Sequence, residues 1–201
     1  MPKTLFIGCH CDDIELGCGG TISKFRDQPM DAVILSQKTL DGKSLKNISY
    51  KTLNQLGINN IYFYKFKPSF FYQHTQQIWE VLKQYDTKQY NCIFTQESDT
   101  HQDHCDLFHI TNRMYLDKSI ITYSSSVVSC PEFKPNYFIG LKKKNVNKKL
   151  RSLKKYKIYK DKIYFQKEII MSNLLTNGAI SGHKYAEGFR IHRVINASPF
   201  L

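Results

Sequence analysis

Short apolar runs alternate with stretches of helical spacing along most of this 201-residue chain, and this alternation constrains the fold more than any other feature. Helical patterns cover residues 15–26, 44–57 and 75–85, the loop in residues 97–116 turns into a fourth helix, and helical spacing returns within 142–167. The apolar runs between them are TLFIGC, DAVILS, NIYFYKF, YNCIFTQ, ITYSSSVV and NYFIGL. This order predicts an α/β fold with a mostly parallel sheet and helices on both faces.

The length of the chain and its 41% hydrophobic residues suffice for one sizeable core, so we expect a single domain over residues 1–201. The first residues enter an apolar strand pattern without a charged leader, and no apolar run approaches the ~20 residues of a membrane span. We therefore expect a soluble, cytoplasmic protein without membrane insertion. The six cysteines show no CxxC spacing, which favours free thiols over disulfides.

The formal net charge of +12 admits more than one explanation. A nucleic acid, an anionic membrane surface or a phosphorylated substrate would each suit a basic protein. However, only five of the 29 basic residues are Arg, and the excess of Lys with many Asn, Ile and Tyr is also what an AT-rich genome would encode. Because Arg is the residue preferred for bidentate phosphate recognition, charge alone selects no partner.

Titratable residues gather where two of the predicted strands end. In parallel α/β sheets the ligand site lies at the carboxyl ends of the strands, so two such ends can face each other across one crevice. The first group follows TLFIGC and the second follows YNCIFTQ; they comprise His10, Asp12, Asp13, Asp99, His101, Asp103 and His104. The sequence thus predicts a site built from two separate loops.

The residue types at these loops suit a catalytic metal. Two or three neutral imidazoles and one carboxylate, with one coordination position open, make up a typical catalytic zinc site, although iron, cobalt or manganese also bind such ligands. His10, Asp13 and one of His101 or His104 would supply that set. Asp12 would then act as general base, and the remaining histidine would stabilise an oxyanion. The alternative is structural, since aspartates after a strand also cap helices.

Two motifs make the sequence similar to a known family. CHCDDIELGCGGT resembles the AHPDDxELGCGGT signature of the LmbE-like, or PIG-L, family of zinc-dependent N-deacetylases, and HQDH resembles the HPDH motif of that family. RSLKKY and YAEGFRI also resemble family segments, in order and at plausible spacing. The resemblance implies a single Rossmann-like domain over residues 1–201.

The resemblance also implies a reaction and a role for each matching residue. Family members hydrolyse the N-acetyl group of an amino sugar, and nucleotide-linked sugars and glycoconjugate precursors are among the substrates to consider. His10, Asp13 and His104 match the zinc ligands. Asp12 matches the general base, and His101 matches the residue that polarises the amide carbonyl.

Three further residues are candidates for substrate binding: Asp99, Glu187 and Arg190. For Glu187 and Arg190, an ion pair that braces the C-terminal strand is an equal alternative. The sequence departs from the family at Cys11, which replaces a proline and either packs or perturbs the metal. It also departs in residues 44–57, which lack the family's Arg-x-x-Glu pair, so the bound sugar is expected to differ.

The lysine-rich stretch 142–167 has two interpretations. Near the crevice it would attract an anionic conjugate of the sugar, and facing away it would be a solvated helix. Two competing functions stay open, a metal-dependent amidase acting on a non-sugar N-acyl substrate and a basic nucleic-acid-binding protein with a vestigial metal site. The latter would stack bases on Tyr156, Tyr159, Tyr164 and Phe165, although their spacing also fits core packing. The short chain also allows a homo-oligomer whose partner subunit shapes the pocket.

Overall fold

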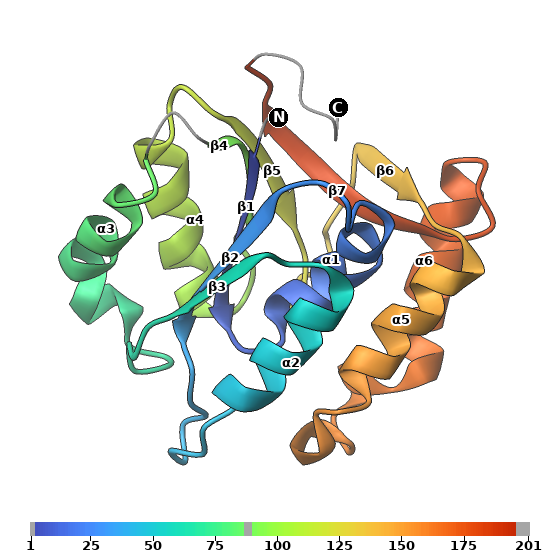
Figure 1. Cartoon of the computed structure of the whole chain (residues 1–201), viewed down its shortest axis with the longest axis horizontal. Coiled ribbons are helices and arrows are strands. Elements are labelled where there is room, and N and C mark those ends of the chain that lie inside the picture. The colour runs from blue at the N-terminus through green and yellow to red at the C-terminus, as the bar shows by residue number, and fades with distance from the viewer. Residues whose placement is uncertain (1–2, 87–89, 196–201) are drawn as a thin grey trace.

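A seven-stranded sheet organises the protein in a computed structural model that describes residues 3–86 and 90–195 (Figure 1). The strand order is β3-β2-β1-β4-β5-β7-β6. The parallel strands are β1 (Lys3–His10), β2 (Met30–Ser36), β3 (Asn60–Phe63), β4 (Tyr90–Gln96) and β5 (Ser119–Tyr123). At one edge, β7 (Ala186–Arg193) pairs antiparallel with β5 and with β6 (Tyr137–Gly140). The predicted single-domain α/β fold with a mostly parallel sheet is confirmed.

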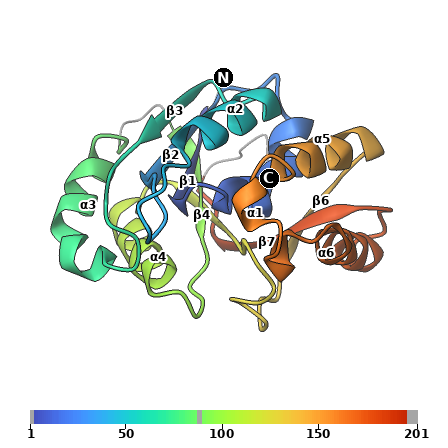
Figure 2. The same ribbon diagram turned by 90° about the horizontal axis from the view of Figure 1, so that it is seen from below.

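Helices cover both faces of this sheet (Figures 1 and 2). One face carries α3 (Thr75–Lys83) and α4 (Gln102–Met114), preceded by the short 3-10 turn η1 (Phe71–His74). The other face carries α1 (Asp13–Lys24), α2 (Lys46–Leu56), α5 (Lys143–Leu153) and α6 (Lys167–Ile180). Two further 3-10 turns, η2 (Lys157–Tyr159) and η3 (Ile163–Phe165), connect α5 to α6.

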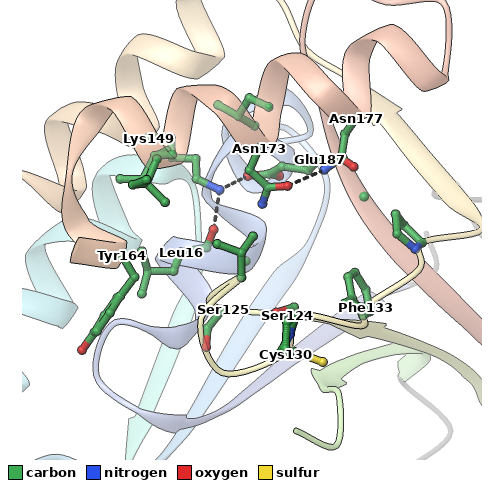
Figure 3. A pocket seen from close by; sticks show the side chains of 18 residues that line it. Leu16, Ser124, Ser125, Cys130, Phe133, Lys149, Tyr164, Asn173, Asn177 and Glu187 are labelled. Carbon is green, nitrogen blue, oxygen red and sulfur yellow. Dashed lines mark hydrogen bonds and ion pairs between the residues drawn. The ribbon is translucent and has the colours of Figure 1, made fainter. Parts of the chain in front are cut away.

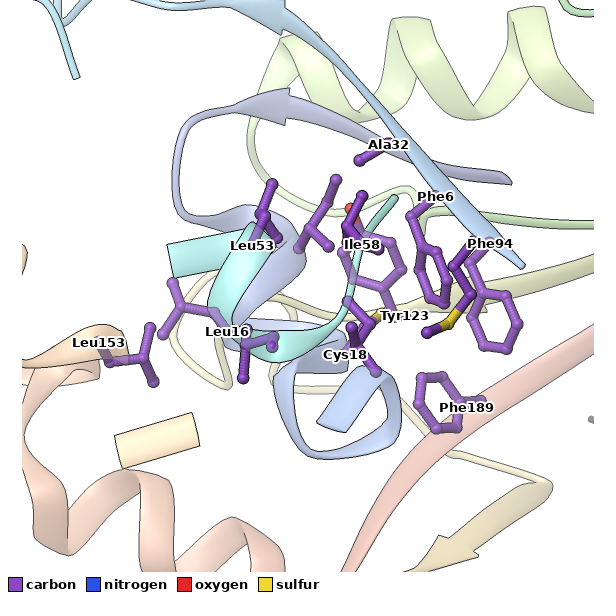
Figure 4. Close-up of a cluster of buried hydrophobic side chains, with 14 of the residues drawn as sticks. Phe6, Leu16, Cys18, Ala32, Leu53, Ile58, Phe94, Tyr123, Leu153 and Phe189 are labelled. Carbon is purple, nitrogen blue, oxygen red and sulfur yellow. The ribbon is translucent and has the colours of Figure 1, made fainter. Parts of the chain in front are cut away.

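The central strand β1 supplies side chains to two separate hydrophobic cores. Leu5 and Ile7 point to the core beneath α3 and α4, whereas Phe6 points to the larger core beneath α1 and α2. In the larger core Phe6 stacks on Phe94 of β4 at 4.8 Å between ring centroids (Figure 4). A parallel strand buried on both faces is apolar throughout, which explains the continuous apolar run of β1.

The site of ligand binding follows from the order of the strands. β1 lies between β2 and β4, and the chain leaves β1 for a helix on one face and β4 for a helix on the other. This reversal opens a crevice at the carboxyl ends of β1 and β4, the usual location of ligands in such sheets. Both titratable loops of the sequence follow these two strands.

Close packing of α1 explains two of its glycines. A Cβ atom at Gly17 would overlap the ring of Tyr123, and one at Gly20 would overlap the side chain of Leu141. Both glycines belong to the motif GCGGT and allow a close backbone approach. The approach is against β5 and the segment after β6, and it holds the N-terminus of α1 at the end of β1.

The sequence predicted most elements but missed one helix. The helix predicted to stop at Gly57 ends there, with a φ of 131° that suits glycine. Helix α6 has apolar residues on several sides, burying Leu174 while exposing Leu175 and Ile180, so it gives no clear helical pattern. Its packing on β7 comes from the tertiary fold.

None of the helices in residues 3–86 and 90–195 combines the length and the apolar character that a bilayer crossing requires. All six cysteines are free, as predicted from their spacing.

Candidate active site and metal centre

The two titratable loops meet at the carboxyl ends of β1 and β4. The imidazole ring of His10, the last residue of β1, lies 4.8 Å from that of His101 and 5.6 Å from that of His104, measured between centroids. The rings of His101 and His104 stack at 4.7 Å. The prediction that residues about 90 positions apart in sequence would meet in one crevice is therefore confirmed.

Asp13 lies between two of these histidines. Its Oδ2 atom is 3.5 Å from Nδ1 of His10, and its Oδ1 atom is 3.6 Å from Nε2 of His104. The backbone N–H of His10 donates to Oδ2 of Asp13 at 2.8 Å, which fixes the carboxylate in the first turn of α1. One carboxylate and two imidazole nitrogens thus converge from three positions.

Each of the two histidines is oriented by a second carboxylate that lies farther from the cavity. Asp99 accepts from Nδ1 of His104 at 2.8 Å, and Asp103 accepts from Nε2 of His10 at 2.9 Å. Asp103 is fully buried and also accepts from the backbone N–H groups of Ser69 and Phe71. Such carboxylate–histidine pairs are typical of metal centres, where they set the ring tautomer. Asp103 had no predicted role, and Asp99 had been predicted to bind substrate.

One observation in particular indicates that these carboxylate and imidazole groups suit a metal ion. Nε2 of His104 is buried and has no hydrogen-bond partner within the described residues. Because Nδ1 donates to Asp99, Nε2 carries a lone pair that is directed toward Asp13. A buried polar atom without a partner is costly, and a cation at this place would satisfy it.

The three predicted metal ligands fall into two different clusters of closely spaced donor atoms. Within 4.8 Å of one another lie the donor atoms of Cys9, Asp13 and His104, and separately those of His10, His101 and Asp103. Cys9 is an unsuitable ligand, since its thiol donates to the carbonyl of Asp103 and burial raises its pKa well above the usual value. With Cys9 set aside, Asp13 and His104 remain from the first group, and the second group comprises His10, His101 and Asp103.

The electrostatics of the site favour a positive charge at its centre. Burial alone would raise the pKa of Asp13, but the imidazoles of His104 and His10 hold it well below its usual range. Burial alone would lower the pKa of His10, but its hydrogen bonds to Asp103 and Asp13 raise it to about 10. The anionic pair Asp13 and Asp103 therefore attracts a cation, be it a proton on His10 or a metal ion.

Asp12 adopts an unusual backbone conformation beside this centre. Its φ is 151°, a value that residues with a side chain rarely adopt, and such strain tends to persist at functional sites. The side chain is 7% exposed and lines the cavity in front of the histidines. Burial and the charge of Asp13 raise the pKa of Asp12. A raised pKa makes a carboxylate a stronger base.

His101 is oriented differently from the other two histidines. It caps α4, and its Nδ1 atom accepts from the backbone N–H of Asp103 at 3.2 Å. The proton of the neutral ring is consequently on Nε2. Burial and the imidazoles of His10 and His104 lower its pKa, which keeps the ring neutral near pH 7.

A cavity of about 740 Å³ opens in front of these side chains. This volume lies within the range of about 300–1,000 Å³ that is usual for small-molecule sites. Residues 38–45 form one rim, and residues 158–164 form the other. Three lysines contribute to its lining: Lys38, Lys43 and Lys162. The basic stretch is thus divided, because α5 exposes Lys143 and Lys144 and buries Lys149, while the segment after it lines the cavity.

Two residues with predicted substrate contacts are engaged elsewhere. Glu187 is 3% exposed beneath α1, where its carboxylate accepts from the backbone N–H groups of Gly20 and Thr21 and pairs with Lys149 at 2.6 Å (Figure 3). Arg190, which lies on the same strand β7 as Glu187, is 3.6 Å from Glu97. Neither residue lines the cavity in front of the histidines. Both placements agree with the alternative that ion pairs brace the C-terminal strand.

Cys11 and Tyr156 are both buried in the larger core. Cys11 is 1% exposed and belongs to neither group of metal-capable atoms within the described ranges. Packing is therefore its observed role. Tyr156 is 1% exposed and donates to Glu15 at 2.6 Å, so its ring is not available for base stacking.

Comparisons with known proteins establish the fold. No protein-family model matches the chain, and no curated protein matches its sequence. The solved structure of the conserved protein TT1542 from Thermus thermophilus is similar, with a TM-score of 0.78 and 15% identity over 100% of this chain and 99% of that one.

Two enzymes of different activity share this fold. The N,N'-diacetylchitobiose deacetylase from Pyrococcus horikoshii, solved with its inhibitor, matches with a TM-score of 0.70 and 19% identity over 99% of this chain and 88% of that one. The 4-carboxy-2-hydroxymuconate hydratase from Pseudomonas putida KT2440 matches with a TM-score of 0.73 and 14% identity over 100% of both chains. At such identities the likeness concerns the fold, and the activity must be argued from the site.

Proposed function

We propose that the protein is a metal-dependent N-deacetylase that hydrolyses the N-acetyl group of an amino sugar, releasing acetate and a free amine. The observation that carries this proposal is the partnerless Nε2 atom of His104 facing Asp13. Further support comes from the motifs of the sequence and from a structural neighbour that is a deacetylase. Zinc is the proposed metal, and another divalent transition metal is the alternative.

Three side chains would hold the metal in this proposal. They are His10 through Nδ1, Asp13 through its carboxylate and His104 through Nε2, because the other ring nitrogens are bound to Asp103 and Asp99. When bound, the metal supplies a Lewis acid that polarises the amide carbonyl and lowers the pKa of water.

Asp12 and His101 would carry the proton transfer and the charge stabilisation. Asp12 lines the cavity and has a raised pKa, so it would accept a proton from the attacking water and pass it to the leaving nitrogen. His101 would donate from Nε2 to the carbonyl oxygen as negative charge develops on it. The balance of the reaction is simple: water adds across the C–N bond, giving a carboxylic acid and an amine.

The lysines of the cavity support an anionic substrate. Lys38 and Lys43 lie on one rim of the cavity and Lys162 on the other, and Lys43 is paired with Asp41 of its own rim at 3.0 Å, so Lys38 and Lys162 carry the unbalanced charge. A phosphate or carboxylate on the sugar would be attracted by both rims, whereas a neutral sugar would gain nothing from them. The proposed substrate is therefore a conjugate such as a sugar phosphate or a nucleotide-linked sugar.

The proposal is tested by acetate release from four compounds with protein of counted metal content. They are N-acetylglucosamine, its 1-phosphate, its UDP-linked form and a non-sugar N-acetyl amino acid. We expect turnover of an anionic sugar, lost in Asp12→Asn. If only the N-acetyl amino acid is hydrolysed, the substrate is a non-sugar amide. If none of the four compounds releases acetate, the proposed N-deacetylase activity is rejected.

A further inference from the structure

A second, smaller cavity lies beside the first one. Its volume is about 100 Å³, and it is enclosed by α1, α6 and the loop between β5 and β6 (Figure 3). Leu16, Ser125 and Tyr164 line both cavities, so these three side chains separate the small cavity from the large one.

The small cavity comes close to the proposed metal centre. The Oγ atom of Ser125 accepts from Nε2 of Gln96 at 2.8 Å, and the same Nε2 atom lies 3.3 Å from Nδ1 of His104. Leu16 belongs to the first turns of α1, which begins at Asp13. The two cavities therefore adjoin at Leu16 and Ser125, close to Asp13 and to the Nδ1 side of His104.

The walls of the small cavity are chemically mixed. Its apolar lining comes from Val127, Phe133, Pro135, Ile169, Ile170 and Leu174. Its polar groups are Lys149 and Glu187, which pair at 2.6 Å, and Asn177, which donates to Asn173 at 3.2 Å. Because the charge of Lys149 is balanced by Glu187, the polar part offers hydrogen bonds without a net charge.

From this arrangement we infer that the small cavity binds the acyl group of the substrate, and that the preferred acyl group is longer than acetyl. This inference rests on the proposed function. An amide has two substituents that point away from each other, and the large open cavity suits the sugar, which leaves the small cavity for the acyl group. A cavity of about 150 Å³ admits benzene, so one of about 100 Å³ takes a chain of roughly four carbon atoms.

The amides at the end of the cavity specify the chemistry of the acyl group further. An uncharged hydroxyl near the end of the chain would find Asn173 or Asn177, whereas a charged end would meet a balanced ion pair. A 3-hydroxybutyryl group has this length and this polarity. Its hydrolysis follows the same balance, with the C–N bond broken by water and 3-hydroxybutyrate released.

The test measures binding and turnover separately. Binding of N-acetyl, N-butyryl and N-(3-hydroxybutyryl) glucosamine is measured by calorimetry with the metal-loaded Asp12→Asn protein, which leaves the substrates intact. Burial of two more methylene groups predicts about tenfold tighter binding of the longer acyl groups than of acetyl. The hydroxyl predicts that the 3-hydroxybutyryl compound binds at least as tightly as the butyryl compound.

A matched pair of substitutions on α6 locates the effect. Ile169→Trp fills the small cavity, whereas Ile180→Trp places the same side chain at an exposed position outside it. We expect Ile169→Trp to abolish the tenfold preference while acetyl binding stays within twofold, and Ile180→Trp to leave the preference intact. Asn173→Leu should remove only the contribution of the hydroxyl.

The results separate this inference from the proposed function. Equal binding of all three compounds, or a preference that survives Ile169→Trp, would overturn the assignment of the cavity even if the wild type releases acetate. A tenfold preference that is lost in Ile169→Trp would uphold the assignment of the cavity. If the wild-type protein binds the compounds with this preference but cleaves none of them, the proposed deacylase reaction is refuted while the assignment of the cavity stands.

Discussion

The two sides of the large cavity are built in different ways. On the side of the sheet, Asp13, Asp103 and His104 are at most 4% exposed and are fixed by hydrogen bonds to one another or to the backbone. On the opposite side, Lys38 and Lys162 are exposed and lie on connecting segments. The difference indicates that the reaction is set by the buried side and the choice of substrate by the exposed rims.

The largest effect is expected at Asp12, on the buried side. Asp12→Asn keeps the shape of the side chain but cannot accept a proton, so turnover should fall by about 10²–10⁴-fold. Metal content measured on the same preparation should be unchanged, because Asp12 is not among the proposed ligands. Turnover within tenfold of the wild type would remove Asp12 from the role of general base.

The second effect concerns stability and tests whether Glu187, which also lines the small cavity, acts by bracing β7. Glu187→Gln leaves the buried charge of Lys149 without its partner, and breaking a buried pair costs about 3–5 kcal/mol. Urea unfolding should show this loss, and the exposed Glu132→Gln is the control. A variant of normal stability with a raised KM would instead return Glu187 to substrate binding.

A smaller effect is expected at the carboxylate that orients His104. Asp99→Ala removes the partner of Nδ1, and the loss of such a partner weakens metal affinity by about 10–100-fold. Competition with a chelator of known affinity would measure it, with the exposed Asp117→Ala as control. Unchanged metal affinity together with weaker substrate binding would favour the role first predicted for Asp99.

The smallest effect is expected on the exposed rim. Lys162→Ala should raise KM for an anionic substrate by about threefold and leave kcat unchanged, because exposed charges are screened by solvent and salt. The effect should shrink at high salt and be absent for a neutral sugar. Equal changes for charged and neutral substrates would show that the rim does not recognise charge.

The sequence predicted the fold and the meeting of the two loops because both follow from short-range patterns. Apolar runs and helical spacing determine the order of the elements, and parallel strands bring their carboxyl ends to one edge. His10 and His101 could therefore be placed in one crevice from their positions after β1 and β4. The roles of individual ligands rest on the family resemblance.

The partners of these residues could not be predicted in the same way. Asp103 contacts His10 across 93 positions of sequence, and only the folded structure shows which way its side chain points. A carboxylate five residues before His104 was a usable signal for Asp99, since metal-binding histidines commonly pair with a carboxylate. The exposed rims carry no pattern of their own, because packing does not restrict their residues.

We propose that His10, Asp13 and His104 hold one metal ion on which the reaction depends. The most direct test is a zinc titration of metal-free wild type and His104→Ala, with acetate release followed on the same samples. We expect one zinc per wild-type chain, turnover that rises in proportion to occupancy, and neither in His104→Ala. Full turnover in the metal-free protein, or tight stoichiometric zinc binding without His104, would contradict it.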